Sequence, residues 1–420
     1  MMSEINCFPK LERIEKAMNL LEGVVVNSPL LYNQSLSEQY GASIYLKRED
    51  LQSVRSYKIR GAFNKISSLS AKERIKGVVC ASAGNHAQGV AYSCNVLDIK
   101  GTIFMPTTTP KQKVLQVKMF GKSNIKVILT GDTFDDSFRE ARKFCDSTNG
   151  SFIHPFDDIS VIEGQATIGI EILKDFKEEL DYLVTPVGGG GLASGVGWYF
   201  KQKSPQTKII GAEPSGALSM KQSIENKKIT ELNSIDTFVD GAAVKRPGVI
   251  TFEICKNVID KIIPTPEGSV CSAILELYNR NAIVAEPAGA LSVAALEFIK
   301  EEIHGKNVVC IISGSNNDIS RTEEIRERSL MYEGLKHYFI VRFPQRAGAL
   351  LNFVNNVLGP NDDITHFSYS KKTNREQGPA LIGIELSCKN DLSMLLDKLY
   401  NNKIIFEYIN DKKDLFGYLI

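Results

Sequence analysis

Lys58 is the side chain of this sequence best suited to covalent chemistry. It lies in the segment 49–62, EDLQSVRSYKIRGA, two residues before Arg60 and at the start of a helical pattern. A lysine attacks a carbonyl carbon only when its amine is partly neutral at the working pH, which requires burial or a nearby cation. Arg60 is close in sequence, although positions two apart on a helix do not face each other. Taken alone, the segment is more typical of an exposed helix lysine.

A second polar segment, residues 80–89 (CASAGNHAQG), joins an apolar run to a helical pattern. It places Ser82, Gly84, Asn85 and His86 in the turn. Backbone N–H groups at a helix N-terminus, together with Ser and Asn side chains, can hold a carboxylate. An ordinary turn in which Asn85 or Ser82 caps the helix explains the segment equally well.

A run of four glycines predicts a phosphate site. Residues 185–197, TPVGGGGLASGVG, follow an apolar run and lead into a helical pattern. Consecutive glycines at such a junction let backbone amides close around a phosphate at the helix N-terminus. The glycines are Gly188, Gly189, Gly190 and Gly191.

The same segment also satisfies the dinucleotide-binding fingerprint. Gly188, Gly190 and Ala193 have the GxGxxA spacing, and Glu213 ends the next apolar run 20 residues after Ala193. An acidic residue at that distance can bind a ribose hydroxyl. From this segment alone, an NAD-linked oxidoreductase is an alternative to an enzyme that binds a monophosphate.

The fourth polar segment, residues 308–318 (VVCIISGSNND), begins as an apolar run and ends in polar residues that start at Ser313. Polar groups at the end of a strand lie where a ligand ring could bind. A turn with Asn316 or Asn317 in the left-handed conformation is the alternative interpretation.

Alternating apolar runs and helical patterns predict how these segments are positioned. From residue 77 the sequence repeats short Val- and Ile-rich runs, each followed by a helical pattern. Runs that are apolar on both faces are typical of strands in a covered parallel sheet, so the expected class is a doubly wound α/β fold. Ligands bind at the carboxyl ends of such strands. The expected strands are 77–81, 99–105, 125–129, 182–187, 208–213 and 308–312, and the expected helices are 86–97, 110–120, 133–148, 192–201 and 217–225.

The pattern changes near residue 330. A charged helical segment, 320–334, reads as a connector to a unit of βαββαβ order, the ferredoxin-like motif of α+β domains. Its first helix, 349–358, is expected to be amphipathic, with Leu350, Val354 and Val357 on one face. The expected strands are 338–343, 364–369, 380–386 and 404–408, and the second helix is 392–399.

Composition limits the possible partners. The chain has 420 residues, 43% of them hydrophobic and 24% charged, and a net charge of +1, which gives no reason to expect nucleic acid or membrane as a partner. Neither a signal peptide nor a run of roughly 18 apolar residues is visible. Eight cysteines without a CxxC pair argue against disulfides and zinc and favour the reducing cytoplasm. Cys80 and Cys310 lie in apolar runs and are expected in the core.

SYK followed by IRGA, SAGNH, GGGGL and SGSNN, in this order and at these spacings, resemble the fold type II (tryptophan synthase β-like) enzymes that use pyridoxal 5'-phosphate. Within that class the chain is similar to threonine dehydratases over residues 10–330, and its C-terminal unit resembles their ACT-like regulatory domain. The resemblance implies a catalytic region of two α/β subdomains in 1–320, a helical linker in 321–336 and a regulatory domain in 337–420.

The resemblance also implies roles for individual residues. Lys58 matches the lysine that holds the cofactor as a Schiff base and then acts as general base at Cα, Asn85 matches the partner of the cofactor's 3'-oxygen, and Ser313 faces its pyridine nitrogen. The phosphate is expected to bind at Gly188, Gly189, Gly190, Gly191 and Leu192, and the substrate carboxylate at the loop of Ser82, Ala83, Gly84 and His86.

The activity implied by this resemblance is dehydration and deamination of L-threonine to 2-oxobutanoate and ammonia, the first committed step of isoleucine biosynthesis. The regulatory domain implies inhibition by isoleucine and antagonism by valine, with residues 343–350 (FPQRAGAL) able to bind an amino-acid carboxylate at a helix N-terminus. A solvated turn capped by Gln345 or Arg346 explains this segment equally well. A single copy of this domain favours a homo-oligomer, with a tetramer expected.

Two departures from relatives of this fold sharpen the expectation. Serine racemases carry a serine where this chain has Ala83, and a methyl group cannot transfer a proton, so racemisation is expected to be negligible. The relatives' cation site pairs a glutamate with an aspartate six residues on, whereas here Glu213 is followed by Ser219, so no metal is expected. A serine/threonine dehydratase, a serine racemase, an NAD-linked oxidoreductase and a non-catalytic amino-acid sensor are the alternatives.

Overall fold

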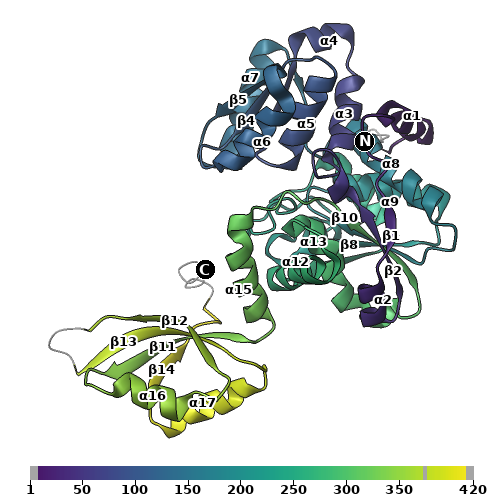
Figure 1. Ribbon diagram of the computed structural model, residues 1–420. Helices are drawn as coiled ribbons and strands as arrows, with labels where there is room; N and C mark the ends of the chain where they lie inside the picture. Colours follow the sequence, from purple (N-terminus) through teal and green to yellow (C-terminus); the bar gives the residue numbers. More distant parts are fainter. Residues whose placement is uncertain (1–7, 372–375, 413–420) are drawn as a thin grey trace. The chain divides into compact units, whose positions relative to one another are not determined.

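Two separate sheets form from the apolar runs of residues 1–317. The computed structural model describes residues 8–371 and 376–412, and the chain divides into two units, Met1–Asn317 and Asp318–Ile420. The larger sheet of the first unit (Figure 1) has the order β1 (Leu30–Tyr32), β2 (Ser43–Arg48), β10 (Asn307–Ile312), β7 (Tyr182–Pro186), β8 (Lys208–Pro214) and β9 (Lys261–Thr265). The smaller sheet has the order β5 (Ile125–Leu129), β4 (Gly101–Met105), β3 (Val78–Ala81) and β6 (Ser151–Phe152).

Every strand pair of these two sheets is parallel except β1–β2. The structure thus confirms the expected α/β class and divides it over two sheets. Cys80 in β3 and Cys310 in β10 are fully buried, as expected for strands covered on both faces.

Strand β10 determines which loops meet, because it lies between two strands that are distant from it in sequence. Its Cys310 is in register with Leu46 of β2 and with Val184 of β7. Parallel strands end at the same edge of a sheet, so the polar segment after β10 and the glycine run after β7 emerge side by side.

Helices cover both sheets, and those expected from the sequence are present with ends shifted by a few residues. All eight residues of α13 are buried, and all of them except Ser292 are apolar, as is typical of a helix enclosed on every side. The helices of the first unit are α1 (Leu11–Leu21), α2 (Gln34–Tyr40), α3 (Lys58–Ser67), α4 (Ala71–Lys76), α5 (Asn85–Val96), α6 (Lys111–Gly121), α7 (Phe134–Thr148), α8 (Ile159–Asp175), α9 (Gly191–Lys203), α10 (Ser219–Glu225), α11 (Val249–Val258), α12 (Glu267–Asn281), α13 (Pro287–Ala294) and α14 (Lys300–Ile303).

The second unit has the predicted βαββαβ order and forms an antiparallel sheet with two helices (Figure 1). The sheet order is β12 (Asp363–Tyr369), β13 (Gln377–Glu385), β11 (Lys336–Pro344) and β14 (Ile405–Tyr408), and the helices are α16 (Ala349–Val357) and α17 (Asp391–Asn401). The charged connector contains α15 (Thr322–Tyr332), whose Arg326 pairs with Glu385 at 2.9 Å. The exact division into 1–320, 321–336 and 337–420 stays a prediction.

The prediction that Leu350, Val354 and Val357 share the apolar face of α16 was correct only for Val357. Leu350 and Val354 are 42% and 38% exposed, and the buried residues are Phe353 and Val357. Residues four apart share one face of a helix, so the row that contains Phe353 and Val357 packs on the sheet and the neighbouring row turns to solvent. Local periodicity did not separate these two adjacent apolar rows.

Candidate active site

Lys58 is the first residue of α3, and contacts with distant segments fix its position. Its Nζ donates a hydrogen bond to the carbonyl of Pro155 at 2.9 Å. The preceding backbone is tied to the segment after β10, since the amide of Tyr57 donates to the carbonyl of Ser313 at 3.1 Å. Gly89 of α5 packs on the Lys58 backbone so closely that a Cβ there would lie 3.1 Å from its carbonyl carbon. The lysine is therefore partly buried where α3, α5 and the segment after β10 meet.

Burial lowers the pKa of Lys58 to about 8, and the nearby Glu286 carboxylate partly opposes this shift. A lysine with this pKa is partly neutral near physiological pH, as a nucleophile or base must be. The nearby cation considered from the sequence, Arg60, is not the cause. Its guanidinium instead lies in a separate buried ionic cluster.

That cluster fixes the first turn of α3. Arg60 donates paired hydrogen bonds to Glu49, both at 2.8 Å, and to Glu171 at 2.7 and 2.8 Å. Lys47 joins it through a 2.7 Å ion pair with Glu171. All four side chains are at most 1% exposed, so two cations and two carboxylates balance one another in the interior.

Replacing Arg60 by methionine is expected to lower the free energy of unfolding by about 3 to 5 kcal/mol, because buried Glu49 loses the cation paired with it and buried Glu171 keeps only Lys47. Chemical denaturation of the two proteins measures the difference. Arg139→Met is the control, since Arg139 is 61% exposed in its pair with Asp136, and such a surface pair contributes about 0.2 to 1 kcal/mol. Equal losses in the two variants would contradict a special role for the buried cluster.

The lowered pKa of Lys58 predicts a specific pH dependence. The pKa of Lys58 is about 8. When the pH is below this value the amine is mostly protonated and cannot attack an aldehyde, and when the pH is above it the amine is mostly neutral. The rate at which apoprotein attaches pyridoxal phosphate should therefore rise with pH and level off above about 8, and not near the 10.5 of an ordinary lysine. Stopped-flow absorbance measures this rate. A rate that is still rising at pH 10 would contradict the prediction.

The glycine run forms a tightly packed turn between β7 and α9. Ideal Cβ atoms would lie 2.7 Å from the Ala242 carbonyl oxygen at Gly188 and 2.3 Å from the Phe156 ring at Gly189. Gly190 has φ +89°, in the left-handed region that favours glycine. Thr251 Oγ1 donates to the Gly189 carbonyl at 2.6 Å and holds the turn from behind.

The first amides of α9, starting at Gly191, have no acceptor within the helix and carry its positive dipole. An anion of phosphate size suits this position. Phe156, which contacts the glycine turn, directly follows Pro155, which accepts the Lys58 hydrogen bond. The glycine run and the lysine are thus neighbours through one short segment.

The turn before α5 leaves the N-terminus of that helix without a side-chain cap. Ser82 Oγ accepts only the amide of Gly84, at 3.3 Å, among the interactions of the described residues, and the Asn85 side chain points elsewhere. The capping alternative considered from the sequence therefore does not describe this turn. Ala83 and Gly84 are half-buried, and the amides of the first turn of α5 could serve a carboxylate.

His86 contributes to that turn through its backbone. Its side chain is 3% exposed, and Nε2 lies 2.9 Å from the Ile153 carbonyl. Burial lowers its pKa to about 3, with Lys58 as a further cause, so the ring is neutral at physiological pH. A neutral, enclosed imidazole cannot act as a cation for a substrate carboxylate.

The segment after β10 contains Ser313 and Asn316, whose side chains form hydrogen bonds with residues of other segments. Ser313 is 2% exposed, and its hydroxyl donates to the Ala288 carbonyl at 3.1 Å. The Asn316 side chain donates to Asn85 Oδ1 at 2.5 Å, which joins the segment after β10 to the start of α5. Neither Asn316 nor Asn317 has a positive φ, so the left-handed turn alternative was wrong.

The sequence reasoning missed Glu286. Its carboxylate accepts a 2.6 Å hydrogen bond from Asn85 Nδ2, although 201 residues separate the two. Burial raises its pKa to about 7. The Glu-Pro pair at the start of an apolar helix was the available signal, since an acidic residue beside a fully buried helix needs a specific partner.

Glu213, the residue considered for ribose or metal binding, caps a helix. Its carboxylate accepts the amides of Met220 at 2.7 Å and Lys221 at 2.9 Å, and the side chain is fully buried. Burial raises its pKa to about 8. It is therefore unavailable to a ribose hydroxyl. No group of three or more His, Cys, Asp or Glu side chains in residues 8–371 and 376–412 is arranged to hold a metal ion.

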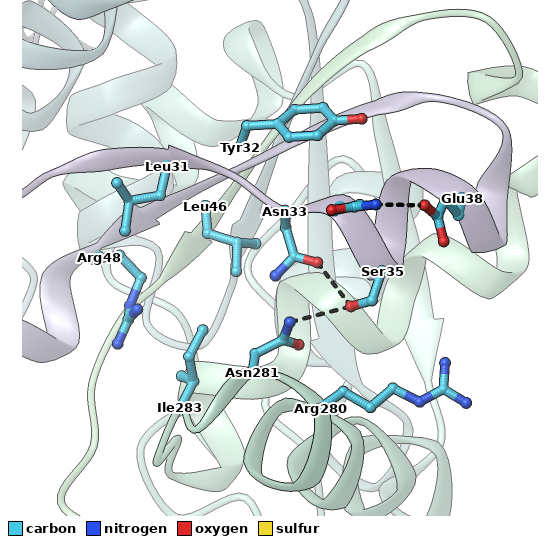
Figure 2. Close-up of a pocket in the computed structure, with 11 residues that line it drawn as sticks. Leu31, Tyr32, Asn33, Ser35, Glu38, Leu46, Arg48, Arg280, Asn281 and Ile283 are labelled. Atoms are coloured by element: carbon cyan, nitrogen blue, oxygen red, sulfur yellow. Dashed lines mark hydrogen bonds between the residues drawn. The ribbon is translucent and has the colours of Figure 1, made fainter.

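A pocket of about 410 Å³ lies away from these residues, between the β1–α2 segment and the end of α12 (Figure 2). In it Asn281 donates to Ser35, which donates to Asn33, both at 3.1 Å. None of the site residues predicted from the sequence lines this pocket.

The site fits a phosphate-bearing aldehyde. The glycine turn is a cradle that side chains would fill, the adjacent helix offers unpaired amides, and the nearby amine has a lowered pKa. Ser56 Oγ and Asn316 Oδ1 are buried and have no hydrogen-bond partner within the described part of the chain, which leaves polar atoms for a ligand.

Comparisons with known proteins agree with a site for a phosphate-bearing aldehyde. The model of the pyridoxal-phosphate dependent enzyme family matches residues 21–314, and that of the C-terminal regulatory domain of threonine dehydratase matches residues 327–419. The chain is 59% identical to the biosynthetic L-threonine dehydratase of Halalkalibacterium halodurans, over 98% of this chain and 99% of that protein. It is 55% identical to the same enzyme of Bacillus subtilis, over 99% and 98%.

Two solved structures are also similar. The processed form of threonine deaminase isoform 2 from Solanum lycopersicum is 39% identical, with a TM-score of 0.72 over 77% of this chain and 95% of that chain. Serine racemase from Dictyostelium discoideum is 33% identical, with a TM-score of 0.69 over 74% and 99%. Fold, site and family model together define a pyridoxal-phosphate dependent enzyme. The chain belongs to the family of biosynthetic L-threonine dehydratases.

Proposed function

We propose that this enzyme converts L-threonine into 2-oxobutanoate and ammonia and that it catalyses the first committed step of isoleucine biosynthesis. The observation that carries the proposal is a partly buried lysine amine, its pKa lowered to about 8, beside a glycine turn built for a phosphate. The names of the similar dehydratases supply the substrate. A steady-state assay of 2-oxobutanoate release tests it, and an inactive protein that binds pyridoxal phosphate would favour an amino-acid sensor instead.

The family resemblance supplies the proposed residue roles, and the contacts described above support them. Gly188 to Gly191 and Leu192 would hold the phosphate, Asn85 the 3'-oxygen, Ser313 the pyridine nitrogen and Lys58 the aldehyde carbon. When bound, the cofactor supplies an electron sink for the Cα–H bond that breaks. Lys58 takes the Cα proton as general base. The amides before and within the first turn of α5, from Ser82 to His86, hold the substrate carboxylate.

Racemisation of serine is the second candidate activity, because a serine racemase shares the fold at 33% identity. A racemase needs acid–base groups on both faces of Cα, and Ala83 offers only a methyl group on the turn before α5. After incubation with L-serine, a pyruvate assay measures dehydration and chiral chromatography measures D-serine. We expect D-serine to form at less than about 1% of the dehydration rate, because a missing acid–base group lowers a rate 10²- to 10⁴-fold. Racemisation at a rate close to that of dehydration would contradict the argument that Ala83 prevents proton transfer on the second face of Cα.

The regulatory domain is proposed to bind isoleucine, which would inhibit, with valine as antagonist and with residues 343–350 near the effector carboxylate. The matching model of a threonine dehydratase regulatory domain supports an effector site. A homotetramer in the cytoplasm is proposed as the working form. No helix in the described part of the chain is long and apolar enough to cross a membrane. Threonine and serine assays with and without isoleucine, on protein sized by light scattering, test these points together.

A further inference from the structure

Glu286 occupies a helix N-cap without capping that helix. Residues at this position commonly accept an amide of the first turn, but the Glu286 side chain makes no such bond with α13. Its carboxylate accepts Asn85 Nδ2 at 2.6 Å and the backbone amide of Asn316. Its own amide donates to the Gly314 carbonyl at 3.1 Å, which fixes its backbone independently of the side chain. The side chain is therefore directed at Asn85 and not at its own helix.

The network determines which way the Asn85 amide faces. Asn316 Nδ2 donates to the backbone carbonyl of Val54 at 3.0 Å, and a carbonyl can only accept, so this nitrogen is identified as a donor. The same nitrogen donates to Asn85 Oδ1 at 2.5 Å, so Oδ1 is the acceptor there. Asn85 Nδ2 consequently faces the Glu286 carboxylate.

The opposite amide orientation is unfavourable on both sides. It would place the Asn85 oxygen against the Glu286 carboxylate and the Asn85 NH₂ group against the Asn316 NH₂ group. Two hydrogen bonds would be lost, and like groups would face each other on both sides of Asn85 in a partly buried place. With one Nδ2 hydrogen on Glu286, the second one remains for a ligand.

The surroundings of Glu286 are charged as well as enclosed. Glu286 is 5% exposed, and its carboxylate acts electrostatically on Lys58 and Tyr57. The negative charge of Asp240, which forms a 2.7 Å ion pair with Lys113, also raises the pKa of Glu286. A Cβ at Gly314 would lie 2.5 Å from its Oε1, so the segment after β10 closes over the carboxylate.

We infer that Glu286 is a positioning residue that, with Asn316, holds the Asn85 amide with a free N–H group directed to the ring oxygen of the cofactor. This inference rests on the proposed role of Asn85. Glu286 contributes to this hydrogen bond only through Asn85, and its electrostatic effect on the pKa of Lys58 is a separate one. A donor at this position stabilises the ring oxygen as an anion, whereas a rotated amide would present a carbonyl oxygen and repel it.

Equilibrium titration of the apoprotein of the full chain with pyridoxal phosphate tests the inference without any activity assay. Asn85→Ala and Glu286→Ala are each expected to weaken cofactor binding about 10- to 100-fold, the effect of one charge-assisted hydrogen bond. The double variant should bind within about twofold of Asn85→Ala, because Glu286 acts through Asn85. Glu286→Gln keeps an acceptor oxygen and should restore binding to within about threefold of the wild type.

Additive losses in the double variant, or a Glu286→Gln variant as weak as Glu286→Ala, would overturn the inference. Asn316→Ala removes the donor on the other side of Asn85, and its expected loss of about 3- to 10-fold keeps the test decisive if Glu286→Ala does not fold.

Glu163→Gln is the matched control, since Glu163 is a buried carboxyl on α8 whose pKa is also raised to about 7. It should bind as the wild type does. If the wild-type apoprotein failed to bind pyridoxal phosphate, the proposed function would fail, whereas wild-type binding with unchanged Glu286→Ala and Asn316→Ala would refute only the role of Glu286.

Discussion

Replacing Lys58 by alanine is expected to lower threonine turnover by at least about 10³-fold, because Lys58 is proposed both to attach the cofactor and to act as the general base at Cα. The visible absorbance of the purified protein should disappear, since no other amine is placed beside the glycine turn by the contacts described above. Steady-state release of 2-oxobutanoate and an absorbance spectrum measure the two effects.

The apoprotein of this variant should be at least as stable as that of the wild type. The pKa of Lys58 is lowered by burial, so below about pH 8 the folded state holds the charged amine at a disadvantage relative to the unfolded chain. Removing the amine removes that disadvantage. A lost activity with a retained melting temperature therefore distinguishes a chemical role from a structural one.

Lys65→Ala is the control on the same helix. Lys65 pairs with Asp158 at 2.8 Å while both side chains are partly exposed, so its loss should change stability by less than about 1 kcal/mol. Turnover and absorbance should stay within about twofold of the wild type. Residual activity of Lys58→Ala above about 1% would contradict the role of Lys58 as the sole Cα base.

Replacing Gly190 by alanine is expected to weaken binding of pyridoxal phosphate by about 10- to 100-fold or more, the loss of one or more charge-assisted hydrogen bonds. The new Cβ would lie 2.6 Å from Met220 Cε and 2.9 Å from Thr251 Cβ, and the residue would have to keep φ near +89°. The turn must therefore move, and its amides would no longer converge on one anion. Titration of the apoprotein measures the affinity.

Gly23→Ala separates backbone strain from loss of the cradle. Gly23 has φ +75°, but a Cβ there would meet nothing within 4 Å. Gly23→Ala should lower the free energy of unfolding by about 1 to 2 kcal/mol, because alanine is strained in the left-handed conformation. It should leave cofactor affinity unchanged. Cofactor affinity of Gly190→Ala equal to that of Gly23→Ala would show that the glycine turn is not the phosphate site.

The sequence by itself determined the features that depend on short stretches of chain. The glycine run, the turn before α5 and the strands β3, β4, β5, β7, β8 and β10 were all predicted, because apolar periodicity and glycine content act locally. The βαββαβ order of the second unit was predicted for the same reason. The role of Lys58 was predicted only in combination with the other motifs, since its own segment is typical of a surface helix.

The tertiary structure determined which strands are neighbours and which distant side chains form hydrogen bonds with each other. Insertion of β10 between β2 and β7 brings Ser313 to the edge where the glycine run lies, and no local pattern records strand order. The partner of Lys58 is 97 residues away, at Pro155, and that of Asn85 is 201 residues away, at Glu286. Side-chain periodicity specifies which residues turn inward but not which inward residues meet.

The same reason explains why two alternatives could not be decided from the sequence. Glu213 was considered for ribose or metal binding, and the fold places α10 so that its amides bind the carboxylate. Arg60 was considered as the cation that tunes Lys58, and Glu49 and Glu171 hold it elsewhere. The lysine amine owes its lowered pKa to burial, a property of the packed interior that residue spacing does not contain.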